Sequence, residues 1–194
     1  MKKISAIIFF ITILILSCIS ISPPKYTTNP PQKDFAAQTI PIAIDINFSD
    51  FEKSEIENAI QEWNGALNNS LVLQVVSKQF DMDPEELASG LNRNELFILK
   101  IDSNSYLVPS EQTLAFTNDL GGNFMYIITD RIYFENLKEI VMHEMGHLLG
   151  ADHDSSGLMM THFDAFEFRC IDKKTMQQIS LMHNLNFENL NYCL

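Results

Sequence analysis

The chain has 194 residues, of which 46% are apolar and 20% are charged. This composition is typical of one globular domain and differs from that of disordered or fibrous chains. Its 13 basic residues stand against 25 acidic ones, a formal net charge of −12, which argues against nucleic acid or anionic lipid surfaces as partners.

The first residues have the pattern of an export signal. Lys2 and Lys3 give a basic start, Ile4–Leu16 is an apolar run, and small residues follow. This pattern predicts a signal peptide over residues 1–17, since the run is short for a permanent membrane helix, which is the alternative. Ile15–Cys18 resembles a bacterial lipobox, so we expect cleavage before Cys18 and a lipid on its thiol. Plain secretion with cleavage nearby is the alternative.

Residues 18–39 are rich in proline, threonine, serine and asparagine and predict a flexible linker, followed by a folded domain over 40–194. Loss of the signal leaves 11 basic residues against 25 acidic ones, a charge of −14. We expect an exported monomer, lipid-anchored to a bacterial cell envelope or secreted, that meets the membrane only through its lipid. Cys170 and Cys193 would then form a disulfide or remain two free thiols.

The folded part reads as a strand, a helix, four strands, and helices separated by loops. Alternation of Ile42, Ile44, Ile46 and Phe48 with polar or small residues predicts a half-buried first strand from Ile40. Ser54 and Glu57 offer a capping box for a helix over 51–68. Strands are predicted over 71–76, 95–101, 113–117 and 124–129, and helices over 84–90, 134–149 and 172–185. This order indicates an α/β (α+β) domain with a mixed sheet.

The turn over 118–122 allows two interpretations. Asp119 is followed by Gly121 and Gly122, which suits either a hairpin turn or a calcium loop. One acidic residue is too few for a hard cation, so the pattern favours the turn.

The most informative string is His143–His153. His143 and His147 are four residues apart on a predicted helix, so both rings can reach one metal ion. Gly150 can take a positive φ, end the helix and return the chain, which brings His153 toward the same ion. Three nitrogen ligands with one open position describe a catalytic zinc site rather than a structural one. His162 or Asp164 is the alternative third ligand.

This string has the form H-E-x-x-H-x-x-G-x-x-H and resembles the metzincin zinc peptidases. The resemblance implies a five-stranded mixed sheet, an active-site helix, a Met-turn and a C-terminal helix. It also implies one catalytic Zn²⁺, Glu144 as general base, and a protein or peptide substrate docked on the edge strand over 113–117. Leu158-Met159 is similar to the matrixin Met-turn, with Met160 as the competing register, whereas Asp154 resembles adamalysins.

The sequence therefore predicts a zinc-dependent endopeptidase that acts outside the cytoplasm. The alternative from another class is a non-catalytic, metal-bound lipoprotein of the same fold, which acts in binding or envelope assembly. An intact Glu144 argues against that alternative, because a copy that has lost catalysis usually loses its base first.

Overall fold

A computed structural model describes residues 26–27, 38–81, 95–133, 136–161 and 169–194. The signal peptide, Cys18, most of the linker, the helix predicted over 84–90, His162 and Asp164 lie outside these residues. None of the described helices combines the length and apolarity that a membrane crossing requires.

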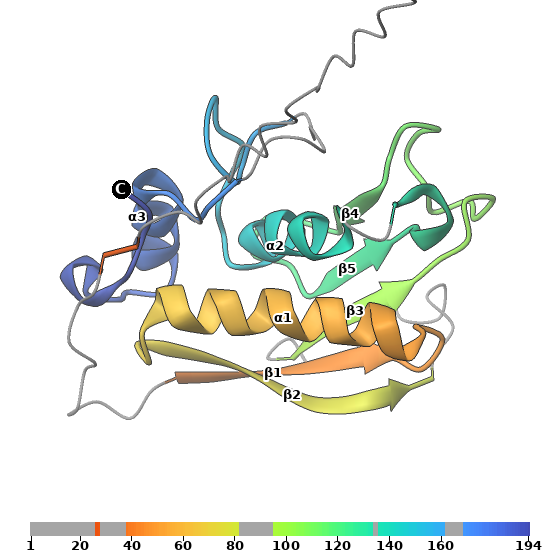
Figure 1. Cartoon of the computed structure of the whole chain (residues 1–194), viewed down its shortest axis with the longest axis horizontal. Helices are drawn as coiled ribbons and strands as arrows, with labels where there is room; N and C mark the ends of the chain where they lie inside the picture. Colours follow the sequence, from red (N-terminus) through yellow and green to blue (C-terminus); the bar gives the residue numbers. More distant parts are fainter. Residues whose placement is uncertain (1–25, 28–37, 82–94, 134–135, 162–168) are drawn as a thin grey trace, which may run out of the picture.

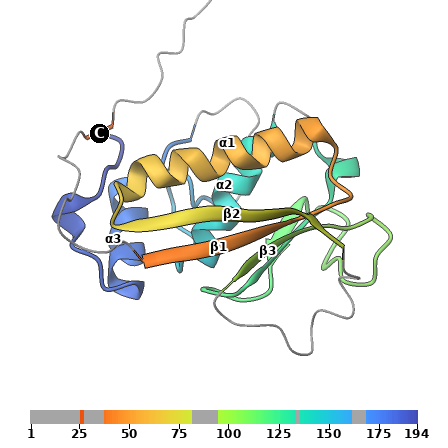
Figure 2. The same cartoon turned by 90° about the horizontal axis from the view of Figure 1, so that it is seen from below.

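One mixed sheet organises the domain, with helices α1 and α2 together on one face (Figures 1 and 2). The strands follow the order β2-β1-β3-β5-β4, and every neighbouring pair is parallel except β4 and β5. The strands are β1 (Gln38–Asp45), β2 (Leu71–Phe80), β3 (Leu96–Lys100), β4 (Ala115–Thr117) and β5 (Phe124–Ile127). The helices are α1 (Asp50–Leu67), η2 (Thr129–Arg131), α2 (Leu137–Leu148), α3 (Lys173–Met182) and η4 (Phe187–Asn189).

The predicted α/β fold with a mixed five-stranded sheet is confirmed, but the half-buried first strand is wrong. In β1, Ile42 and Ile44 pack into the core under the helices, while Ala43 packs into a second apolar cluster on the opposite face. The strand ends at Asp45, and Ile46 beyond it is 42% exposed. A strand with parallel neighbours on both sides is covered on both faces, so period-two alternation does not describe its burial.

The N-cap of helix α1 lies five residues before the predicted one. Ser49 is the N-cap: its hydroxyl accepts from the Glu52 amide at 3.3 Å, and Glu52 accepts from the Ser49 amide at 2.6 Å. The box predicted at Ser54 and Glu57 is therefore wrong, because both residues lie inside the helix, where the amides already bond to preceding carbonyls.

Contacts between α1 and α2 hold the second helix over the sheet. Trp63 of α1 is fully buried, and its indole nitrogen donates to the carbonyl of Met142 in α2 at 3.0 Å. Buried aromatic residues of this kind need such a partner for their polar atom. This hydrogen bond anchors α2 to α1 at Met142, the residue directly before the first histidine, His143.

The C-terminal segment closes one end of the domain. A disulfide joins Cys170 and Cys193, whose Cα atoms are 6.2 Å apart. Asn191 donates from its amide to Ala66 at 2.8 Å, which attaches the segment to the end of α1. Tyr26 pairs with Cys193 in an isolated bridge, so the start of the described chain also lies against this segment.

Candidate metal centre

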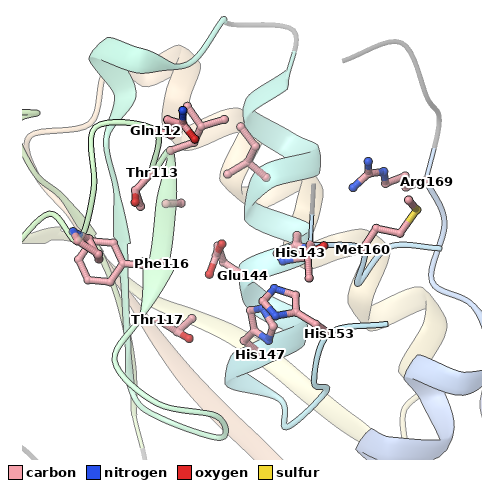
Figure 3. Close-up of a pocket in the computed structure, with 15 residues that line it drawn as sticks. Gln112, Thr113, Phe116, Thr117, His143, Glu144, His147, His153, Met160 and Arg169 are labelled. Carbon is pink, nitrogen blue, oxygen red and sulfur yellow. The ribbon is translucent and has the colours of Figure 1, made fainter. Parts of the chain in front are cut away.

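Three histidines meet beside the C-terminal half of α2, in the arrangement that the sequence predicts. Their ligand nitrogens all lie within 4.8 Å of one another, and no other group among the described residues has metal-ligand spacing. His143 and His147 project from one face of α2, while His153 approaches from the following loop (Figure 3). The calcium loop predicted as an alternative at Asp119 has no such cluster among those residues.

Backbone carbonyls orient the two helix histidines. Nδ1 of His143 lies 2.7 Å from the carbonyl oxygen of Leu158, and Nδ1 of His147 lies 2.8 Å from that of Ala151. A carbonyl can only accept, so both rings carry their proton on Nδ1 and leave the Nε2 lone pair for a metal. The hydrogen bond at Nδ1 fixes the tautomer and the direction of each ring.

Burial favours the neutral, metal-binding form of the two helix histidines, His143 and His147. Burial lowers the pKa of His143 to about 4, although its bond to Leu158 works in the opposite direction. Burial also lowers the pKa of His147. A metal ion therefore does not compete with a proton for these nitrogens at neutral pH.

A distance between two rings tests whether zinc fits. Nε2 of His147 and Nε2 of His153 lie 3.2 Å apart. Two ligands of a tetrahedral zinc ion with bonds of about 2.0–2.1 Å are separated by about 3.3–3.4 Å. The observed separation of the two nitrogens is close to this value. The three-histidine site thus fits a catalytic Zn²⁺ ion.

The loop that carries His153 begins at Gly150. Its φ of +94° lies in the region that favours glycine, and the Ala151 amide bonds back to Gly146 at 2.8 Å. A Cβ at Gly150 would also come within 2.8 Å of Met182. The glycine thus allows both the reversal of the chain and the close packing of α3 beneath it.

Helix α3 holds the returning loop in place. Gln178 accepts from the amide of Asp152 at 2.6 Å, and Lys174 pairs with Asp154 at 2.6 Å. These two contacts lie on either side of His153. The position of the third histidine therefore depends on α3, whose Lys174 and Gln178 lie 20 and 26 residues after the residues that they contact.

The two methionines of the predicted Met-turn have different surroundings. Met159 is fully buried, and its sulfur packs against Gly146 of α2, between the two helix histidines. Met160 instead lines the cleft. The carbonyl of Met159 accepts from Asp154 at 2.8 Å, which closes the turn under the site.

Glu144 lies in the cleft next to the histidines. Only 8% of its surface is exposed, and burial raises the pKa of its carboxyl to about 8 in the metal-free chain. Figure 3 shows its carboxylate between the histidines and strand β4. A cation at the histidines would favour the ionised carboxylate. Glu144 is therefore a buried carboxyl group that lines the cleft beside the histidines.

The cleft itself has a volume of about 450 Å³ and runs between β4 and the histidines. The sequence pointed to the metal-binding string and the edge strand but not to several side chains of the walls. Its lining outside the histidines and Glu144 includes Gln112, Thr113, Phe116, Thr117, Met160 and Arg169. Gln112 and Arg169 belong to neither the predicted edge strand nor the predicted Met-turn, so only their position in the fold identifies them.

Comparison with known proteins gives a fold but no family. No protein-family model and no curated protein matches the sequence. The archaemetzincin of Methanopyrus kandleri has a TM-score of 0.51 and 12% identity, over 76% of this chain and 94% of that one. Metalloproteinase-II of Bacteroides fragilis has a TM-score of 0.47 and 18% identity, over 66% of this chain and 47% of that one.

The fold and the site together define an α/β domain with a three-histidine metal centre in a cleft beside an edge strand. The particular fold is the one that this chain shares with the archaemetzincin.

Proposed function

We propose that the chain is a zinc-dependent endopeptidase of the metzincin type. The observation that carries the proposal is the convergence of His143, His147 and His153 beside the buried carboxylate of Glu144, in a cleft bordered by an edge strand. The likeness to the archaemetzincin, together with the H-E-x-x-H-x-x-G-x-x-H string, supports this class. The fully buried Met159 beneath the helix histidines supports its role as the Met-turn residue.

The edge strand offers a backbone ladder to a peptide. Leu114 accepts from Ile128 at 2.9 Å and Asn118 donates to Phe124 at 3.1 Å, so residues 114, 116 and 118 exchange bonds with β5. In antiparallel pairs these positions alternate, which turns the N–H and C=O groups of Ala115 and Thr117 away from β5. We propose that these groups bind the substrate backbone by strand addition.

Each residue of the site then has one role. The three histidines would hold the zinc ion, which when bound polarises a scissile carbonyl and makes water a stronger acid. Glu144 accepts a proton from the attacking water at its carboxylate and delivers it to the amine of the leaving peptide. The walls of the cleft orient the peptide and reduce its contact with bulk water.

A comparison of two glutamates on the same helix tests the proposal. Glu144→Gln keeps the shape of the side chain and removes the base, and we expect it to retain zinc and lower kcat by a factor of about 10²–10⁴ or more. Glu139→Gln is the matched control, because Glu139 belongs to α2 but does not line the cleft. The assay measures cleavage of mixed peptides with and without a chelator, and zinc content by elemental analysis.

The result would separate the candidate functions. Cleavage by the Glu144→Gln protein within tenfold of wild type would remove the base from the mechanism. If the purified wild-type chain binds zinc but cleaves no peptide, the non-catalytic metal-bound lipoprotein becomes the better description. Loss of zinc together with activity in Glu144→Gln would instead indicate that this carboxylate is a ligand.

We also propose an exported, lipid-anchored protein that meets its protein substrates outside the cytoplasm. The basis is the sequence before the domain: the basic and apolar start over residues 1–17 and the lipobox-like string that ends at Cys18. The high net negative charge suits an exported protein.

A further inference from the structure

The rim of the cleft next to β4 comes from a long connection. Residues 101–114 join β3 to β4, and their last part, including Pro109, Gln112 and Thr113, lines the cleft. The two ends of the connection bond to the sheet through Ile101 and Leu114, whereas the backbone bonds between them are short-range turns, such as Val108 to Ser105 at 3.1 Å and Thr113 to Ser110 at 3.2 Å. Leu107 and Val108 pack against the second apolar cluster of the sheet, so the middle of the connection is held by apolar contact. Neither these contacts nor the turns fix the direction of the backbone carbonyls near the cleft.

Arg131 provides an attachment from outside the connection. It lies in η2, directly after β5, and its guanidinium donates to three backbone carbonyls of the connection. One terminal nitrogen donates to Ser110 at 2.9 Å and to Thr113 at 3.0 Å, and the other donates to Ser103 at 2.9 Å. A planar guanidinium with several donors in fixed directions holds three acceptors in one geometry, which a lysine ammonium does less well.

The bond to Thr113 affects the edge of the sheet itself. Thr113 continues the alternate set of Ala115 and Thr117, whose backbone groups point away from β5. Its carbonyl is bonded to Arg131. The backbone ladder that β4 offers to the cleft therefore begins at Ala115, and the same guanidinium that holds the rim also ends the ladder.

We infer that Arg131 is a positioning residue for the substrate. It holds the rim so that Ala115 and Thr117 face the cleft, and it restricts backbone pairing with a bound peptide to these two residues. This inference rests on the proposed peptidase function. It adds that the site binds only a short segment of the peptide backbone and holds that segment in one register along β4. Arg131 touches neither the histidines nor Glu144, so its effect is on binding rather than on the chemical step.

Three variants separate this role from a general effect on folding. Arg131→Met keeps much of the length of the side chain but removes every donor, and Arg131→Lys keeps the charge. Lys53→Met is the matched control, because Lys53 donates to a single loop carbonyl, that of Ile46 at 3.0 Å, on another part of the sheet. Each protein is assayed with a nested series of peptides that extend one cleavage site by one residue at a time on either side.

For Arg131→Met we expect KM to rise about tenfold, the effect of one or two lost backbone hydrogen bonds, with kcat within about threefold of wild type. Zinc content should not change. The dependence of KM on peptide length should also flatten on one side of the cleavage site. The KM of Arg131→Lys should lie between those of Arg131→Met and wild type, and the KM of Lys53→Met should match that of wild type.

Hydrogen exchange gives a readout that does not depend on activity. In Arg131→Met the amides of the connection, residues 103–113, and the amide of Ala115 should exchange faster, whereas the amides of α1 should not change. An active Arg131→Met protein with wild-type KM across the whole peptide series would overturn the inference and leave the proposed function intact. A parallel fall in kcat, zinc content and α1 protection would also overturn it, by showing a purely structural role. A wild-type protein that cleaves no peptide would refute the proposed function instead.

Discussion

Two glycines on two helices should respond in opposite directions to the same substitution. Gly146 lies between the metal-binding histidines of α2, and a Cβ built there would overlap the sulfur of Met159 and lie 3.1 Å from its methyl group and 3.5 Å from Trp63. Gly65 lies in α1, and a Cβ there would meet no atom within 4 Å. Both positions gain helix propensity when glycine becomes alanine.

The magnitudes follow from two opposing terms. Alanine instead of glycine in a helix interior stabilises by up to about 1 kcal/mol. Overpacking of a core costs about 1–3 kcal/mol. Met159 is fully buried, so its side chain cannot move outward into solvent to relieve the overlap. We therefore expect Gly146→Ala to destabilise the metal-free protein by up to about 2 kcal/mol and Gly65→Ala to stabilise it by up to about 1 kcal/mol. For a domain of this size, 1 kcal/mol corresponds to about 2–4 °C in Tm.

The assay is thermal and denaturant unfolding of both variants without metal and with the disulfide intact, followed by zinc titration. Gly146→Ala should also weaken zinc binding, because His143 and His147 lie on either side of the displaced contact. Combining Gly146→Ala with Met159→Ala should cost less than the sum of the two single changes, since the smaller side chain removes the overlap. The reasoning would be refuted if Gly146→Ala proved as stable as Gly65→Ala.

The remaining predictions concern the covalent link, one carboxylate and the N-terminus. Replacing Cys170 and Cys193 by serine should lower the free energy of unfolding by about 3 kcal/mol in the chain-entropy model, measured in urea; an unchanged transition midpoint would contradict it. For Glu52, burial raises the carboxyl pKa, but bonds from the Ser49 amide and from Lys100 outweigh burial, so the pKa lies below 4.5 in the folded chain. A lowered pKa stabilises the fold above the unfolded value, so Glu52→Gln should be less stable at pH 7, and the difference should close as pH falls through the lowered pKa. A difference that stays constant with pH would exclude this charge effect. Cys18→Ala, expressed in a bacterial host, should move from the membrane fraction to the soluble fraction; a soluble wild type with an unmodified N-terminus would remove the lipid from the proposal.

The amino-acid sequence by itself determined the chemistry of the centre. Residue spacing was sufficient there, because a helix places residues four apart on one face regardless of what surrounds it. The helix alone brings His143 and His147 together, and Gly150 indicated where the chain turns back toward them. The order of strands and helices followed in the same way from local periodicity, so the mixed sheet and the two long helices were predictable.

Burial and cap positions needed the tertiary structure, because both depend on neighbours that are distant in sequence. The burial of β1 on both faces arises because parallel strands lie on each side of it. The sequence of β1 alone does not indicate which strands will be its neighbours. The cap at Ser49 depends on where the chain leaves β1, so a second serine and glutamate pair at Ser54 and Glu57 looked equally suitable.

Tertiary structure alone decided what supports the cleft outside the predicted edge strand and Met-turn. Arg131 carries no motif, and it contributes to the site because η2 places its guanidinium beside carbonyls 18–28 residues earlier in the chain. Helix α3 positions His153 through Gln178 and Lys174 for the same reason. A short motif encodes which atoms can bind a metal, since those atoms lie within a few residues of one another. The surface on which a peptide would lie is assembled from segments that only the folded chain brings together.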